Sequence, residues 1–222
     1  MTRPIASNRP ENTPLGEPQR GQLTRFLELV YGAPAGLNLT RVPRAHAWAR
    51  HVEESLALLP LRAWSAGELV IDLGSGAGLP GVPLAIARPE SDVLLVERDR
   101  AKAAQLLRLV GELGLGNVAV VSEDAKALPA RPGFRRADLL VSRAALPPEQ
   151  LVPLARRLLG AKGELLAHVG GSFQLGPRLE ALAARAGFAC PQLVPAGPVR
   201  LLRLRRAAAC QTGCTASPPR QT

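Results

Sequence analysis

The segment Val70-Ile-Asp-Leu-Gly-Ser-Gly-Ala-Gly-Leu-Pro-Gly81 carries the strongest structural signal in this chain. Hydrophobic residues from Leu69 to Leu73, interrupted only by Asp72, predict a short buried strand. Glycines at alternate positions then allow a tight turn and a close approach to a ligand, because no Cβ atom intervenes. Pro80 suits the start of a helix, where its missing N–H is not needed. A helix N-terminus behind a bare glycine loop is typical of a nucleotide-type binding site.

The glycine pattern aligns with two binding motifs. Residues 76–81 have the G-x-G-x-x-G spacing of dinucleotide-binding proteins, whereas residues 72–78 have the D-x-G-x-G-x-G spacing of S-adenosylmethionine (SAM) enzymes. The acidic residue Asp72, two positions before the first glycine, favours the SAM alignment. In that alignment Asp72 ends the strand, where its carboxylate can bind an amino group or hold the loop.

From Leu69 onward, short hydrophobic segments alternate with amphipathic ones, which predicts an α/β fold with a parallel sheet and helices on both faces. The expected strands are 69–73, 93–97, 118–121, 138–142 and 164–169. The expected helices of this part are 79–87, 100–113, 148–159 and 176–186. Residues 200–205, where Leu and Arg alternate, are expected to add an antiparallel edge strand.

The composition divides the chain into four parts. Residues 1–20 are expected to form a disordered leader, 21–65 a helical extension with helices near 22–31 and 45–59, 66–206 the sheet domain, and 207–222 a disordered tail. No run of about 18 hydrophobic residues exists, so no transmembrane helix is expected. The N-terminus has no hydrophobic signal segment, which predicts a cytoplasmic protein with no membrane partner.

The formal net charge of +10 favours a polyanionic partner, with nucleic acid the first candidate. The alternative is that the many arginines reflect a GC-rich genome. An aromatic share of only 3% disfavours a base-stacking platform. Cys190, Cys210 and Cys214 match neither a disulfide framework nor a zinc site, so no metal is expected.

Ligands of open parallel sheets bind beyond the carboxyl ends of the strands. Glu97 ends the second expected strand, where an acidic residue accepts hydrogen bonds from ribose hydroxyls of either NAD or SAM. Asp124 and Ala125 follow the third strand, where SAM enzymes often bind the adenine. Ser142 and Arg143 close the fourth strand and face the expected cleft.

Together these residues resemble the bacterial small-subunit rRNA methyltransferase G (GidB) family over about 22–205. The motifs that carry the resemblance are Asn38-Leu-Thr40, Arg50-His-x-x-x-Ser55, the glycine loop 72–81, Arg88-Pro89, Val96-Glu-x-Asp99 with Lys102, and Ser142-Arg-Ala144. The resemblance implies the class I SAM-dependent methyltransferase fold, which is Rossmann-like with a mostly parallel seven-stranded sheet. It also implies methylation of a guanine N7 in 16S rRNA.

The resemblance and the motif reasoning together predict the site residues. Cofactor contacts are expected at Asp72, Gly74, Gly76, Gly78, Leu79, Glu97, Asp124, Ala125, Lys126 and Arg143. Asn38, Thr40, Arg50 and His51 are expected at the RNA-facing mouth. Arg143 is also expected to orient the guanine or a phosphate during catalysis. Surplus arginines, including Arg41, Arg44 and the group at 200–206, are expected to neutralise phosphates of the small ribosomal subunit.

Guanine N7 carries an in-plane lone pair, so no general base must remove a proton before attack. We expect catalysis mostly from positioning, with the chain acting as a monomer. Some family features are absent: Glu54 stands where the family usually has Asp, and Val169 stands where it usually has Lys. The Trp-Asn pair that usually precedes the Asn-Leu-Thr segment is also missing.

Two alternatives stay open at this point. A nicotinamide-dependent oxidoreductase would use the same glycine loop, but the chain lacks a Tyr-x-x-x-Lys motif, and its only tyrosine, Tyr31, lies outside the expected sheet. A SAM-binding ribosome-assembly factor that has lost activity would account for the substitutions at Glu54 and Val169.

Overall fold

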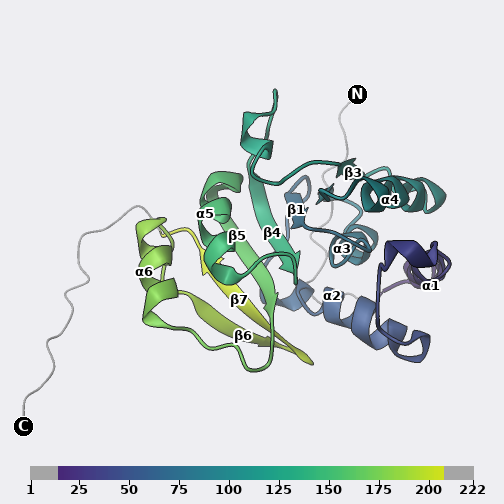
Figure 1. Cartoon of the computed structure of the whole chain (residues 1–222), viewed down its shortest axis with the longest axis horizontal. Helices are drawn as coiled ribbons and strands as arrows, with labels where there is room; N and C mark the ends of the chain where they lie inside the picture. The colour runs from purple at the N-terminus through teal and green to yellow at the C-terminus, as the bar shows by residue number, and fades with distance from the viewer. Residues whose placement is uncertain (1–14, 208–222) are drawn as a thin grey trace, which may run out of the picture.

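A single seven-stranded sheet organises the computed structural model, which describes residues 15–207 (Figure 1). The strand order is β3-β2-β1-β4-β5-β7-β6. Strands β1 to β5 run parallel to one another, and β7 runs antiparallel to both β5 and β6. The strands are β1 Leu69–Leu73, β2 Asp92–Val96, β3 Val118–Val121, β4 Ala137–Arg143, β5 Leu159–Val169, β6 Gln192–Ala196 and β7 Val199–Arg205.

Helices cover both faces of the sheet, as the alternating pattern predicts. The α-helices are α1 Glu17–Tyr31, α2 Glu54–Leu56, α3 Gly81–Ala87, α4 Arg100–Glu112, α5 Pro148–Leu158 and α6 Pro177–Arg185. One hydrophobic core joins α1, α3 and α4 to one face of the sheet, and a second core joins α5 and α6 to the other. Each face of the central strands is therefore buried, which is why β1 is hydrophobic at almost every position.

The strand order changes direction at β1, because β2 pairs with one side of this strand and β4 with the other. In open parallel sheets the ligand crevice lies at such a point, beyond the carboxyl ends of the strands. The glycine loop follows β1 directly, so the fold places the loop in that crevice.

The C-terminal part of the sheet differs from the prediction. The expectation of an edge strand at 200–205 is wrong, because β7 lies between β5 and β6. Leu201, Leu202 and Leu204 are fully buried. Because Leu201 and Leu202 are consecutive, their side chains point to opposite faces of the sheet, so both faces of β7 must be covered. Strand β6, which contains Pro195, forms the edge and was not among the expected segments. A proline is tolerated in an edge strand, because one side of that strand makes no ladder hydrogen bonds.

The helical extension is less regular than expected. The single helix predicted over 45–59 is replaced by short turns: the 3₁₀ turn Arg44–His46, the π-helical turn Trp48–Glu53, helix α2 and the 3₁₀ turn Leu59–Leu61. The Ser55 hydroxyl donates to the carbonyl oxygen of His51 at 2.5 Å, a side-chain bond of the type that bends helices. This irregular segment turns the side chain of His51 toward the end of β4.

Helix α1 begins at Glu17, inside the stretch predicted to be a disordered leader. Gln19 holds this helix to α3, because its amide donates to the carbonyl oxygens of Ile86 and Ala87 at 3.1 and 3.3 Å. The remainder of the predicted leader, the predicted tail beyond Ala207, Cys210 and Cys214 lie outside the described residues. Within the described range, no helix has the length and hydrophobicity needed to cross a membrane.

Candidate active site

The loop between β1 and α3 has the backbone conformation that its glycines predict. Gly74, Gly76 and Gly78 have φ angles of 69°, 54° and 89°, a region that side chains with a Cβ rarely adopt. A Cβ atom at Gly74 would lie 2.4 Å from the Cβ of Ala145, in the connection between β4 and α5. The loop therefore passes this connection at a distance that only glycine allows.

Glu97 fixes the loop from the neighbouring strand. Its two carboxylate oxygens accept hydrogen bonds from the backbone N–H groups of Gly76 and Asp99, each at 2.9 Å. Asp99 in turn caps helix α4 by accepting from the N–H groups of Ala101 and Lys102. The carboxylate of Glu97 is buried, oriented by two donors, and retains free lone pairs for a ligand.

A cavity of about 350 Å³ lies beside this carboxylate. Several of the predicted cofactor residues line it, namely Gly74, Glu97, Asp124, Ala125 and Lys126. The carboxylate of Asp124 accepts from the backbone N–H of Lys126 at 2.8 Å, which orders the loop after β3. The volume is within the range of small-molecule sites, and the carboxylates of Glu97 and Asp124 can accept hydrogen bonds from hydroxyl and amino groups of the kind that SAM carries. The residues present therefore fit SAM.

Asp72 lies at the base of the loop and is fully buried. Its Oδ2 accepts a hydrogen bond from the N–H of Gly81 at 3.0 Å, but its Oδ1 has no partner among the described residues. Burial, opposed by the Gly81 N–H and the charge of Arg143, raises the pKa of Asp72 to about 7. Like Gly76, Gly78 and Leu79, Asp72 does not line the 350 Å³ cavity, so its predicted contact with the cofactor stays a prediction.

Arg143 ends β4 but points toward the helical extension. Its Nη1 donates to the carbonyl oxygen of Arg50 at 2.9 Å, and its Nη2 lies 3.4 Å from Nδ1 of His51. Glu54, which is almost buried, lies 3.9 Å from Nη1 of Arg143 and forms a 2.6 Å ion pair with Arg50. Arg143 does not line the cofactor cavity. Its predicted contact with the cofactor stays a prediction, whereas its contacts with Arg50 and His51, both predicted for the RNA-facing mouth, are a feature of the structure.

His51 connects Arg143 to the Asn-Leu-Thr segment. Its Nε2 lies 2.9 Å from Oγ1 of Thr40 and 3.4 Å from the hydroxyl of Tyr31. Burial, followed by the charge of Arg143, lowers the pKa of His51 to about 4. The ring is therefore neutral at pH 7, and the geometry fits a tautomer in which Nδ1 accepts from Arg143 and Nε2 donates to Thr40.

Other predicted residues lie apart from these groups. Asn38 is exposed in a left-handed backbone conformation, and its amide donates only to Gly36. The side chain of Leu79 is in the hydrophobic core, which leaves only its backbone for a cofactor contact. Arg203 and Arg205, expected to be available for phosphates, both donate to the carboxylate of Glu164 instead.

The sequence analysis missed residues that the fold adds to the site. Leu146 and Gln150, from the connection after β4 and the start of α5, line the cofactor cavity. Tyr31 donates to the carbonyl oxygen of Val42 at 2.7 Å and supports the His51 contact. Leu146 could have been found from its place just after the strand end at Arg143, whereas no local signal points to Tyr31.

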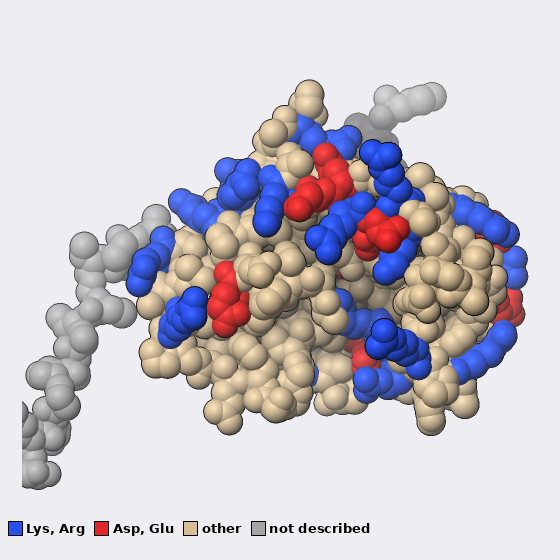
Figure 2. Space-filling view, in the orientation of Figure 1, with Lys and Arg blue, Asp and Glu red and all other residues tan. Residues whose placement is uncertain are grey.

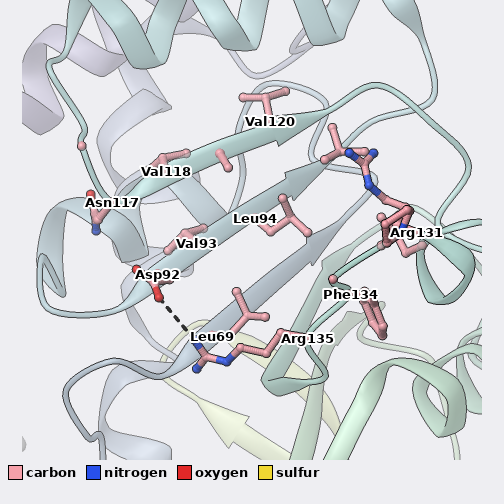
Figure 3. A pocket seen from close by; sticks show the side chains of 16 residues that line it. Leu69, Asp92, Val93, Leu94, Asn117, Val118, Val120, Arg131, Phe134 and Arg135 are labelled. Atoms are coloured by element: carbon pink, nitrogen blue, oxygen red, sulfur yellow. Dashed lines mark hydrogen bonds and ion pairs between the residues drawn. The ribbon is translucent and has the colours of Figure 1, made fainter.

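A second hollow of about 550 Å³ lies on the face of β2 and β3 (Figure 3). Its floor is hydrophobic, with Leu69 and Leu94 pointing into it, and Asp92 pairs with Arg135 at its rim. The chain between β3 and β4 contains only the 3₁₀ turn Leu128–Ala130, so no helix covers this face. None of the predicted site residues line this hollow.

Among residues 15–207, no group of three His, Cys, Asp or Glu side chains lies close enough to hold a metal ion. Solved structures with the same fold include a SAM dependent methyltransferase from Aquifex aeolicus, at 15% identity and a TM-score of 0.56, covering 78% of this chain and 97% of that one. A fibrillarin pre-rRNA processing protein from Methanococcus jannaschii matches at 17% identity and a TM-score of 0.50, covering 65% and 69%. The expected fold class is confirmed.

The family model for rRNA small subunit methyltransferase G matches residues 19–175. The relatives include proteins named Ribosomal RNA small subunit methyltransferase G. The protein from Nitrosospira multiformis is 41% identical over 67% of this chain and 66% of its own length. Those from Sorangium cellulosum and Anaeromyxobacter dehalogenans are 36% and 37% identical, over 75% and 79% of this chain and 72% and 80% of their own lengths. This chain belongs to the rRNA small subunit methyltransferase G family.

Proposed function

We propose that this protein transfers the methyl group of SAM to N7 of a guanine in 16S rRNA of the small ribosomal subunit. Family membership supports the enzyme class, an SAM-dependent rRNA methyltransferase. The observation that carries the proposal is the hydrogen bond between Glu97 and the glycine loop, beyond the carboxyl end of β1 where the strand order changes direction. There Glu97 holds the glycine loop through Gly76, beside a cavity whose acidic acceptors suit an adenosyl group.

Different residues around the cavity bind different parts of the cofactor. Glu97 accepts from ribose hydroxyls, Asp124 from the adenine amino group, and the backbone of Ala125 approaches the adenine ring. The unpaired oxygen of Asp72 lies under the loop, where it can attract the amino group of the cofactor. When bound, SAM supplies a methyl group on a cationic sulfonium.

Arg143 orients the substrate from the other side of the crevice. Its guanidinium is half-buried and is held by the Arg50 carbonyl, His51 and Glu54. Because several partners fix this cation, it can meet a guanine oxygen or a phosphate without first being ordered. His51 holds Arg143 in place rather than removing a proton, since both of its ring nitrogens are occupied and the pKa is lowered to about 4. Guanine N7 needs no base, so positioning alone accounts for the residues present.

The departures from the family pattern do not disturb the cofactor side. Glu54 keeps an ion pair with Arg50 and lies near Arg143, as a carboxylate at this position is expected to do. The oxidoreductase alternative is not favoured by the family match, and neither is the inactive assembly factor. The further proposals are that residues 21–65 shape the RNA-facing mouth, that the protein acts as a monomer, and that it acts in the cytoplasm where small subunits are assembled.

The test is methyl transfer from labelled SAM to small subunits that lack this modification, followed by mapping of the labelled base. We expect label at a single guanine N7. The E97A variant should lose both SAM binding and transfer, whereas E180A, which removes an exposed carboxylate on α6, should keep both. Label at another atom, or no label although SAM binds, would overturn the proposal. Equal activity of E97A and E180A would overturn the assigned role of Glu97.

A further inference from the structure

A group of cationic side chains gathers at the end of the sheet opposite to the cofactor cavity. We call it the α5 C-terminal cluster, and it consists of Arg136, Arg156, Arg157, Lys162 and Arg206. Within the described range, none of these five side chains forms an ion pair with a carboxylate. Figure 2 shows Lys and Arg side chains spread over the α5 and α6 side of the molecule.

Two of these arginines converge on the last turn of helix α5. Arg136 donates to the carbonyl oxygens of Arg157 and Leu159 at 2.9 and 3.2 Å, and Arg206 donates to those of Arg156 and Leu159 at 2.8 and 3.3 Å. The partial negative charge at a helix C-terminus attracts them there. Burial, then the charges of Arg156 and Arg136, lowers the pKa of Arg206, so like charges lie close together in this cluster.

Arginines next to the cluster behave differently. Arg135 forms ion pairs with Asp92 and Asp138, and Arg205 pairs with Glu164. The chain therefore neutralises some cations at this end of the sheet and leaves others exposed. Arg156 and Arg157 are both exposed, and their side chains donate no hydrogen bond to any described residue. An accumulation of unpaired, exposed cations attracts the phosphates of a polyanion.

The cluster is too far from the cofactor cavity to touch the same nucleotide as Arg143. Strand β4 joins the two places, because Arg136 directly precedes the strand and Arg143 ends it. A strand of this length spans about 20 Å. The two places lie at opposite ends of the sheet, so an RNA that reaches both must pass around the protein and extend well beyond the target guanine.

Resting on the proposed function, we propose that the α5 C-terminal cluster binds phosphates of a second rRNA segment, remote in space from the target guanine. The substrate is then folded rRNA, as in the small subunit, and not a short strand around the guanine. The cluster contributes affinity and orientation and takes no part in the chemistry, because phosphate contacts position a protein without reading sequence.

The test compares two double neutralisations on exposed helix surfaces. R156Q/R157Q removes two unpaired charges of the cluster, and the matched control R25Q/R108Q removes two charges that are already paired with acidic residues on α1 and α4. Glutamine has nearly the helix propensity of arginine, so both variants should fold. R156K/R157K, which keeps the charges, should bind like the wild type. Binding to small subunits is measured over a range of salt concentrations. SAM affinity is measured as well, and so is binding to a minimal hairpin that contains the target guanine but is too short to extend from Arg143 to Arg136.

We expect R156Q/R157Q to bind small subunits about 10-fold or more weakly, as two charge-assisted contacts are lost. Its log–log salt slope should become shallower by about 0.7–0.9 for each lost phosphate contact. SAM affinity and hairpin binding should match the wild type. The proposal is overturned if R25Q/R108Q loses as much affinity, or if hairpin binding falls equally. If the wild type binds subunits without methylating them, the proposed function fails, while the salt slopes still decide the role of the cluster.

Discussion

Replacement of Asp72 by Asn should make the protein more stable at alkaline pH while abolishing its activity. The wild-type carboxyl is fully buried, and burial raises its pKa from 3.8 to about 7. This difference corresponds to about 4 kcal/mol of lost stability once the group is ionised, at about 1.4 kcal/mol for each pH unit. Asparagine avoids this penalty, but its NH₂ group takes the place of the unpaired oxygen and costs about 1–3 kcal/mol if it finds no acceptor. A net gain of about 1 kcal/mol or more remains at pH 8.

The sign of the effect depends on pH. Because the pKa of Asp72 is higher in the folded state than in the unfolded chain, the folded state binds the extra proton between pH 3.8 and about 7. The stabilisation that comes from this proton is fully present below pH 3.8 and is lost as the pH rises toward 7. At pH 4 the penalty is nearly absent, so D72N should be less stable than the wild type there. The order of the two proteins should reverse between pH 4 and pH 8.

Urea unfolding at pH 4, 6 and 8 measures the free energy of unfolding of both proteins, and SAM titration measures cofactor binding at pH 8. D92N, which changes an exposed carboxylate at the start of β2, serves as the control and should show no reversal. A stability difference between D72N and the wild type that stays constant from pH 4 to pH 8 would refute the argument. So would SAM affinity in D72N equal to that of the wild type, because Asp72 would then not bind the cofactor.

Three further predictions concern the glycine loop, the guanidinium at the end of β4 and a buried ion group. Gly76→Ala and Gly67→Ala both place a Cβ at positive φ without a contact shorter than 3.8 Å, so each should cost about 1–2 kcal/mol in unfolding experiments. Only Gly76→Ala should also weaken SAM binding, and equal SAM binding by both would show that the loop does not hold the cofactor. Arg143→Lys loses the forked contact with the helical extension and should lower kcat about 100-fold, with SAM affinity unchanged in calorimetry; an unchanged kcat would contradict its orienting role. Glu164→Gln removes the buried partner of Arg203 and should cost about 3–5 kcal/mol in urea unfolding, whereas a loss below about 1 kcal/mol would show that the ion group gives no net stability.

The central strands could be predicted because their hydrophobic runs are unambiguous. Strands β1 and β3 begin and end where the sequence predicted, since each is a short hydrophobic run bounded by turn residues. Strand β5 starts at Leu159, five residues earlier than expected. Its first residues include glycines and a lysine, and it follows α5 without a connecting turn, so no local signal separates the helix from the strand. Pairing with β4 across a register shift near Ala137 decides that boundary.

The two sides of the candidate site differ in how far the sequence predicts them. Glu97 could be placed near the glycine loop because the loop follows β1 and Glu97 follows β2. The two strands are adjacent and parallel, and only helix α3 separates them in the chain. The contact between Arg143 and His51 joins residues 92 positions apart, through a helical extension that contains a π-helical turn. Neither hydrophobic periodicity nor motif spacing predicts the direction of a long side chain at such a distance. Of the residues predicted for the cofactor, Gly74, Glu97, Asp124, Ala125 and Lys126 line one cavity, whereas the contacts that join Arg143 to His51 and Arg50 were not predicted.

The position of β7 between β5 and β6 has a consequence for the order in which a growing chain can fold. Strands β2 to β5 each pair in parallel with a strand that precedes them in the chain, whereas β6 pairs with β7, which follows it and is the last strand among the described residues. Until Val199–Arg205 emerges, the edge of β5 stays open, and Glu164 lacks Arg203 and Arg205. The half of the sheet that holds the glycine loop can thus form early, while closure of the other half waits for β7. A chain truncated shortly before residue 199 would have an exposed hydrophobic strand edge at β5, which is a substrate for chaperones and a site for aggregation.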